Sequence, residues 1–164
     1  MATPRYAWDS CAWIAMIIQE QSLLKDGGVE DRAKLCNHVI GLAAKKQLEI
    51  ATSGLALAEV CKHDEVKAVD GDDLADFFRN DYILVVPTDR NVGTLARKLM
   101  QSGYPGLKPP DAVHLATAIV ADVKELHTFD KKLLGLDGKL EMPSGGVLKI
   151  CKPFGPPPSL LDGM

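Results

Sequence analysis

The sequence predicts an α/β fold, a three-layer α/β/α sandwich around a mostly parallel central sheet. Short apolar runs alternate along the chain with longer segments of helical periodicity. Several of these runs are followed at once by a residue that commonly caps helices, as at Asp9, Ser53 and Asp89. The run Tyr82–Pro87 is apolar and rich in β-branched residues, which is typical of a strand covered on both faces. Alternating strands and helices of this kind favour a parallel sheet with helices on its two faces.

Each element follows from its local pattern. The predicted strands are Arg5–Trp8, Leu48–Thr52, Tyr82–Pro87, Glu125–Phe129 and Val147–Cys151. The predicted helices are Ala12–Leu24, Val29–Lys46, one that begins at Ser53, a short one at Leu74–Phe78, one that begins at Thr88 or Asp89, Asp111–Ala121, and a short turn at Lys131–Leu134. The first helix is expected to end at Gly27 and Gly28, because paired glycines interrupt helical periodicity.

Length and composition indicate one globular domain. The chain has 164 residues, of which 46% are hydrophobic and 25% charged. We expect a domain over residues 1–152 and a proline-rich tail over residues 153–164.

The apolar segment Ala12–Ile18 is too short to cross a membrane, and no secretory signal is evident, so we expect a cytoplasmic protein. The net charge of −3 gives no general attraction for nucleic acid, so such binding needs a local basic patch, a metal or a partner. None of the four cysteines forms a Cys-x-x-Cys pair, which argues against a zinc site.

Four acidic residues stand where one predicted element gives way to the next: Asp9, Glu59, Asp111 and Asp130. In a parallel sheet, functional groups gather at the carboxyl ends of the strands, where these residues can converge. A pocket of carboxylates repels itself unless a hard divalent cation fills it, and oxygen ligands suit Mg²⁺ or Mn²⁺. The sequence therefore predicts a metal site of the kind that hydrolyses phosphodiester bonds.

Each acid also has a simpler interpretation. Helix capping alone would explain Asp9 and Asp130, and Asp111 is an ordinary residue for a first helical turn. Glu59 is harder to explain in this way, because it interrupts an apolar helical segment where an unpaired carboxylate is costly to bury. His114 follows Asp111 by one helical turn and is interpreted mainly as a helix histidine satisfied within the fold.

The order and contexts of the acids resemble those of PIN-domain nucleases, most closely the stand-alone toxins of the VapC type. The matching segments are Trp8-Asp9-Ser10, Ser53 to Glu59, Asp111-Ala-Val-His-Leu-Ala-Thr-Ala, and Thr128-Phe129-Asp130-Lys131. The third segment is the most specific of them. The resemblance covers roughly residues 5–152, which is nearly the whole chain.

The resemblance implies a metal-dependent endoribonuclease. Asp9, Glu59 and Asp111 would hold Mg²⁺ or Mn²⁺, and Asp130 would complete the acidic pocket. Ser10 and Thr128 would orient a carboxylate, a water ligand or a phosphate, and Lys108 is the lysine best placed for phosphate contact. The resemblance further implies an RNA substrate, a small antitoxin protein as partner, and a homodimer.

Two other functions stay open. A phosphatase of the haloacid dehalogenase kind needs an early Asp-x-Asp, and Cys11 stands where the second acid would be. A non-catalytic PIN-like module that binds RNA or a protein is the stronger alternative, although all four acids are present.

Overall fold

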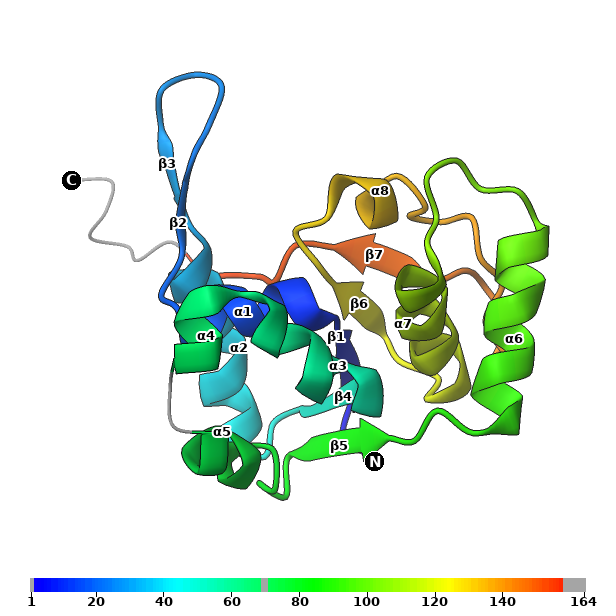
Figure 1. Ribbon diagram of the computed structural model, residues 1–164, viewed down its shortest axis with the longest axis horizontal. Coiled ribbons are helices and arrows are strands. Elements are labelled where there is room, and N and C mark those ends of the chain that lie inside the picture. Colours follow the sequence, from blue (N-terminus) through cyan, green and yellow to red (C-terminus); the bar gives the residue numbers. More distant parts are fainter. Residues whose placement is uncertain (1, 69–70, 158–164) are drawn as a thin grey trace.

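The central sheet consists of five strands in the order β5-β4-β1-β6-β7, and every neighbouring pair is parallel. This computed structural model describes residues 2–68 and 71–157. The strands are β1 (Arg5–Trp8), β4 (Glu49–Ser53), β5 (Ile83–Val86), β6 (Glu125–His127) and β7 (Lys149–Cys151). With helices on both faces of this sheet, the fold is the predicted α/β/α sandwich (Figure 1).

The side chains of each strand alternate between the two helical layers. Ala7, Ala51 and Leu126 pack into one core, together with α6 (Arg90–Gln101) and α7 (Pro109–Val120). Tyr6 and Trp8 pack into the other core. The helices of this second layer are α1 (Ser10–Ile17), α2 (Arg32–Ala44), α3 (Gly54–Glu59) and α5 (Gly71–Phe77), with the 3₁₀ turn η1 (Val60–Lys62) and α4 (Asp64–Ala68) between α3 and α5. The short helix α8 (Lys131–Leu134) follows β6.

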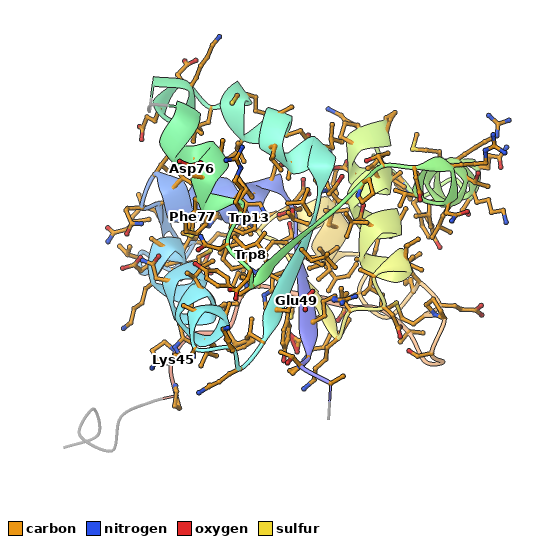
Figure 2. The ribbon with its side chains drawn as sticks, turned by 90° about the horizontal axis from the view of Figure 1, so that it is seen from below. Trp8, Trp13, Lys45, Glu49, Asp76 and Phe77 are labelled. Atoms are coloured by element: carbon orange, nitrogen blue, oxygen red, sulfur yellow. The ribbon has the colours of Figure 1, made fainter. Side chains whose placement is uncertain are left out.

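Two tryptophans form the centre of the second core. Trp8 and Trp13 meet edge to face with ring centroids 4.7 Å apart, and Phe77 lies beside them (Figure 2). The indole N–H of Trp13 donates to Thr52 Oγ1 over 3.0 Å, and the Thr52 hydroxyl donates to the Trp8 carbonyl over 2.9 Å. The buried polar atoms of this core are therefore paired, and the pairing ties α1 to β4 and β1.

The first predicted helix is wrong beyond residue 17. The chain leaves α1 at Ile18, and Gln19 adopts a left-handed backbone conformation with φ of 54°, which a helix cannot contain. An antiparallel hairpin of β2 (Gln21–Leu23) and β3 (Val29–Asp31) follows and projects from the body (Figure 1). Helix α2 then begins at Arg32 rather than Val29, because the Asp31 carboxylate caps it by accepting from the Lys34 N–H at 3.0 Å.

The apolar run Tyr82–Pro87 contains strand β5, and its side chains reach both cores: Ile83 and Val85 pack into one, and Val86 packs against the other. Strand β5 lies at the edge of the sheet, and Leu84 keeps 36% of its surface exposed. An edge strand is hydrogen-bonded to a neighbour on one side only, and the local sequence carries no information about which strand will lie at the edge of the sheet.

The end of the chain packs against the second core as far as it is described. Phe154 contacts the rings of Tyr6 and His127, with centroid distances of 5.7 and 5.5 Å. Residues 158–164, the remainder of the predicted tail, lie outside the described residues, and the division at residue 152 stays a prediction. Among the described helices, none combines the length and the hydropathy needed to span a bilayer.

Candidate active site

Strand register brings three polar residues to one end of the sheet. Trp8 pairs with Thr52 on β4 and with His127 on β6. The residues that follow in the three strands are therefore level with one another: Asp9, Ser53 and Thr128. This is the carboxyl end of adjacent parallel strands, the position where α/β proteins place their functional groups.

Asp9 is the most buried acid of the group, with only 2% of its surface exposed. Its Oδ1 accepts from the Ala12 N–H at 3.1 Å and so caps α1. Its Oδ2 accepts from the Thr128 hydroxyl at 2.5 Å. Ser10 follows as the first residue of α1 and is also buried. Capping does not exclude metal binding, because a carboxylate offers about four lone-pair sites.

Burial raises the pKa of the Asp9 carboxyl above its ordinary value. The hydrogen bond from Thr128 and the positive potential of His114 lower this pKa, but they do not offset the loss of hydration. Asp130 adds a smaller upward contribution through its negative charge. An ionised Asp9 is therefore a group that a nearby cation would stabilise.

Glu59 is held by a histidine from another helix. Its Oε1 is hydrogen-bonded to Nε2 of His114, a buried residue of α7 that lies 55 positions along the chain. Its Oε2 lies 3.5 Å from the Lys62 ammonium. The hydrogen bond from His114 is the largest cause that lowers the pKa of Glu59. His114 thus contacts a predicted site residue, and the one sequence signal for this was its place one turn after Asp111.

Asp111 and Asp130 stand at the starts of two helices. Asp111 Oδ2 accepts from the backbone N–H of Lys108 at 3.2 Å, and the Lys132 ammonium lies 3.9 Å from the same oxygen. Asp130 caps α8 by accepting from the Lys132 N–H at 2.8 Å. Its own N–H donates to Thr128 Oγ1 at 3.0 Å, so the Thr128 hydroxyl links Asp9 to Asp130. The Lys108 side chain is exposed beside these acids.

Three of the predicted acids, Asp9, Asp111 and Asp130, act electrostatically on the same group, the Cys11 thiol. Burial is the main cause that raises the pKa of the Cys11 thiol to about 12, and the negative charges of Asp9, Asp130 and Asp111 all raise it further. The pKa of Asp9 is also affected by the charges of His114 and Asp130. Asp9, Asp111 and Asp130 therefore share one electrostatic environment, and Glu59 is connected to it through His114. No three of them bring their oxygens within 4.8 Å of one another, since each carboxylate is bonded to a different partner.

A second group of possible ligands lies along β6 and β7. Glu125, His127 and Cys151 offer ligand atoms within 4.8 Å of one another. The Trp8 indole N–H donates to His127 Nδ1 at 3.1 Å, which leaves the ring proton on Nε2, facing Glu125 at 3.1 Å. A metal-bound histidine normally donates its second ring N–H, and this is the opposite polarity. Cys151 and Lys149 also donate to Glu125, so this group is a complete hydrogen-bond network in its own right.

The acidic group fits a hard divalent cation by its chemistry. Its donors are all carboxylate oxygens, the ligands that Mg²⁺ and Mn²⁺ prefer. The buried Asp9, whose pKa is raised by lost hydration, is the donor with most to gain from a cation. Since no three of these carboxylates bring their oxygens within 4.8 Å of one another, an ion shared by them would be held partly through water, which Mg²⁺ commonly retains.

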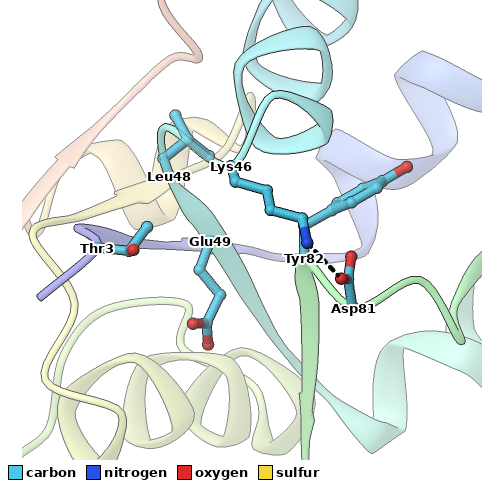
Figure 3. A pocket seen from close by; sticks show the side chains of 6 residues that line it. All are labelled: Thr3, Lys46, Leu48, Glu49, Asp81 and Tyr82. Atoms are coloured by element: carbon cyan, nitrogen blue, oxygen red, sulfur yellow. Dashed lines mark ion pairs between the residues drawn. The ribbon is translucent and has the colours of Figure 1, made fainter.

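A small cavity of about 140 Å³ lies at the other end of the sheet (Figure 3). It is bordered by Glu49 and Tyr82, at the starts of β4 and β5, and by an exposed ion pair of 3.1 Å between Lys46 and Asp81. The amino ends of parallel strands are not where such folds place their chemistry, so this cavity is set apart from the candidate site.

Comparison with protein families decides the classification. The model of the PIN domain matches residues 29–139, which is more than half of the chain and includes Glu59, Asp111 and Asp130. The chain belongs to the PIN-domain family. Asp9 lies before the matched range and joins the other acids only through the strand register.

Solved PIN-like structures show the same fold. The Mycobacterium tuberculosis toxin VapC20, which cleaves the sarcin-ricin loop, is 16% identical with a TM-score of 0.55, over 77% of this chain and 90% of that chain. A chain of VapBC2 from Rickettsia felis, bound to a DNA fragment from its promoter, is 18% identical with a TM-score of 0.53, over 89% of this chain and 98% of that chain. No curated protein matches the chain.

Proposed function

We propose that this PIN-domain chain is a metal-dependent endoribonuclease that hydrolyses RNA phosphodiester bonds, and that it is the toxin of a toxin–antitoxin pair. The observation that carries the proposal is the buried Asp9 at the carboxyl end of the sheet, which the Thr128 hydroxyl links to Asp130 and whose pKa is also affected by His114, the partner of Glu59. Membership of the PIN-domain family supports it, as does the likeness in fold to VapC20.

The four acids have distinct proposed roles. Asp9, Glu59 and Asp111 would hold Mg²⁺ or Mn²⁺, directly or through water, and Asp130 would complete the pocket. When bound, the ion would lower the pKa of a water ligand and neutralise charge on the scissile phosphate. A site carboxylate would accept the proton of the attacking water.

Several neighbours would keep these acids in place. Thr128 orients Asp9 through its hydroxyl, and His114 orients Glu59 through Nε2. Ser10 is the second small hydroxyl residue at the site. Lys108 is the proposed phosphate contact, because its exposed side chain stands at the start of α7, beside Asp111.

Cleavage of total cellular RNA tests the enzyme. The purified protein should give discrete fragments with Mn²⁺ and none with EDTA, and Asp111→Asn should lose at least about 100-fold in rate, as expected for a lost metal ligand. Asp89→Asn is the matched control, because Asp89 caps α6 with the same chemistry and is not among the four acids. Absence of cleavage together with absence of any metal response would instead favour a non-catalytic PIN-like binding module.

The toxin role and its partners follow from the same proposal. An RNA target implies a cytoplasmic location, and VapBC2 supports a small antitoxin as partner. Expression of the chain should arrest growth, and co-expression of a neighbouring antitoxin gene should restore it; unimpaired growth would contradict the toxin role. The predicted homodimer should sediment at about twice the chain mass of 17.7 kDa.

A further inference from the structure

The β2–β3 hairpin stands outside the sheet that carries the acids. It projects from the body next to α1 and α2 (Figure 1). Leu23 and Val29 pair across it and keep 80% and 58% of their surfaces exposed. An isolated two-stranded hairpin is marginally stable in water. Here its base is fixed, because the Ala33 N–H donates to the Glu20 carbonyl at 3.1 Å and Arg32 pairs with Glu20 at 3.4 Å.

A groove of about 690 Å³ is lined by the hairpin, the start of α8 and the residue after β7. Its lining carries four cations, Lys25, Arg32, Lys131 and Lys152, against two anions, Asp26 and Glu30. The lining thus has a local excess of two positive charges on a chain whose net charge is −3. Such a patch attracts a polyanion that the whole molecule would not attract.

Glu30 arranges two of these cations. Its two oxygens bind Arg32 Nε at 3.1 Å and Lys152 Nζ at 2.6 Å. Burial acts to raise the pKa of Glu30, but the hydrogen bonds from Lys152 and Arg32 outweigh it and lower that pKa, so Glu30 stays ionised. In the described part of the chain, no carboxylate lies within ion-pair distance of Lys25 or Lys131. These two lysines are therefore the groove cations most available to a ligand.

The groove continues toward the acidic site. Arg32 also lines an adjoining hollow of about 160 Å³, whose other walls include Cys11, Phe129 and Asp130. The Arg32 guanidinium lies 4.8 Å from the centre of the Phe129 ring, which holds it between the two spaces. The groove and the hollow that reaches Asp130 are therefore neighbours that share Arg32.

We propose that this groove binds a single-stranded segment of RNA next to the bond that is cleaved. Phosphates would contact Lys25 and Lys131, and unpaired bases would lie against the exposed apolar side chains of Leu23 and Leu24. A duplex could not make the second contact, because its bases are stacked on one another inside the helix. The inference rests on the proposed function. Of the groove cations, Arg32 and Lys131 lie within the range matched by the PIN-domain model, and Lys25 and Lys152 lie outside it.

The test is binding of a labelled single-stranded RNA oligonucleotide in EDTA, measured by fluorescence anisotropy at several salt concentrations. The variant Lys25→Glu/Lys131→Glu should weaken binding by at least about tenfold and reduce the slope of log Kd against log salt by about 1.4, or ~0.7 for each lost phosphate contact. The matched control Lys45→Glu/Lys98→Glu changes the same charge at two exposed lysines that do not line the groove, one directly after α2 and one in α6. It should bind within about twofold of the unmodified protein.

Three outcomes overturn the proposal of a single-strand groove. Equal weakening in both variants would show a general charge effect, and binding of an RNA duplex as tight as that of the single strand would exclude the strand assignment. The nuclease proposal is tested separately, with Mn²⁺ and Asp111→Asn. A protein whose groove variant binds and cleaves RNA as the control does would keep the nuclease function and lose this groove. A protein that shows no metal response but still binds RNA in the groove would keep the groove and lose the nuclease function.

Discussion

At the scale of single residues, Asp9 joins two roles in one carboxylate. It caps α1 and accepts from Thr128, and burial nevertheless raises its pKa. A folded-state pKa above the ordinary 3.8 means that the folded protein binds this proton more tightly than the unfolded chain. Ionised Asp9 therefore costs stability, and that cost develops as pH rises from 3.8 through the raised pKa.

Asp9→Asn should accordingly raise the melting temperature at neutral pH in EDTA. Asparagine caps helices about as well as aspartate, so relief of the buried charge should dominate, by a few degrees where 1 kcal/mol equals roughly 2–4 °C. The gain should disappear as pH falls below 3.8, where the carboxyl is protonated in both the folded and the unfolded state. A variant that melts several degrees lower at neutral pH would show that capping by the charged form matters more than its burial.

Glu125 gives the opposite dependence on pH. Hydrogen bonds from His127, Cys151 and Lys149 hold its pKa at about 2, below the ordinary 4.5. Its contribution to stability is complete above pH 4.5 and is lost as pH falls toward 2. Glu125→Gln should therefore lower the melting temperature at neutral pH, with a difference that shrinks below pH 4.5 in thermal scans. A difference independent of pH would assign the effect to packing rather than to the charge.

At the scale of elements, local caps set where helices begin. Asp9, Asp31, Ser53, Asp89 and Asp130 each accept a backbone N–H at the start of a helix. These residues were visible in the sequence, and all but Asp31 were identified there as helix starts. The hairpin was not identified there, because Leu24 continues the helical spacing of the first predicted helix, and tertiary structure overrides that spacing at Gln19.

Asp89→Ala removes a helix cap that is not one of the four predicted site acids. It should reduce the free energy of unfolding by about 1 kcal/mol in urea titrations, since α6 loses the bond to the Val92 N–H. RNA cleavage should be unchanged at temperatures well below melting, because Asp89 is not among the four acids and, within the described part of the chain, its carboxylate bonds only to its own helix. Lost cleavage with an unchanged melting temperature would place Asp89 in the reaction.

At the scale of the whole molecule, metal binding should couple to folding. Repulsion among the acids is present in the folded state, and an ion that binds only that state stabilises it by mass action. Mn²⁺ at about 100 times its Kd should stabilise the protein by about 2.7 kcal/mol, seen as a rise in melting temperature. Asp111→Asn should reduce that rise, and Asp89→Asn should not. An unmodified protein without any rise at several millimolar Mn²⁺ would contradict the metal site.

The sequence by itself determined the fold class, most strands and helix starts, and the four acids with their contexts. Those features are local, because a helix period, a cap or an apolar run is decided within a few residues. The resemblance to the PIN-domain family was also visible in local segments, such as the one that begins at Asp111, within the range that the family model matches.

Only the tertiary structure decided which distant groups meet. The pairing of Glu59 with His114, the link from Asp9 through Thr128 to Asp130, and the edge position of β5 depend on register and packing. The basic groove combines Lys25, Arg32, Lys131 and Lys152 from separate parts of the chain. Contacts of this kind gain their free energy from burial and charge pairing across the folded molecule, and no local pattern records them.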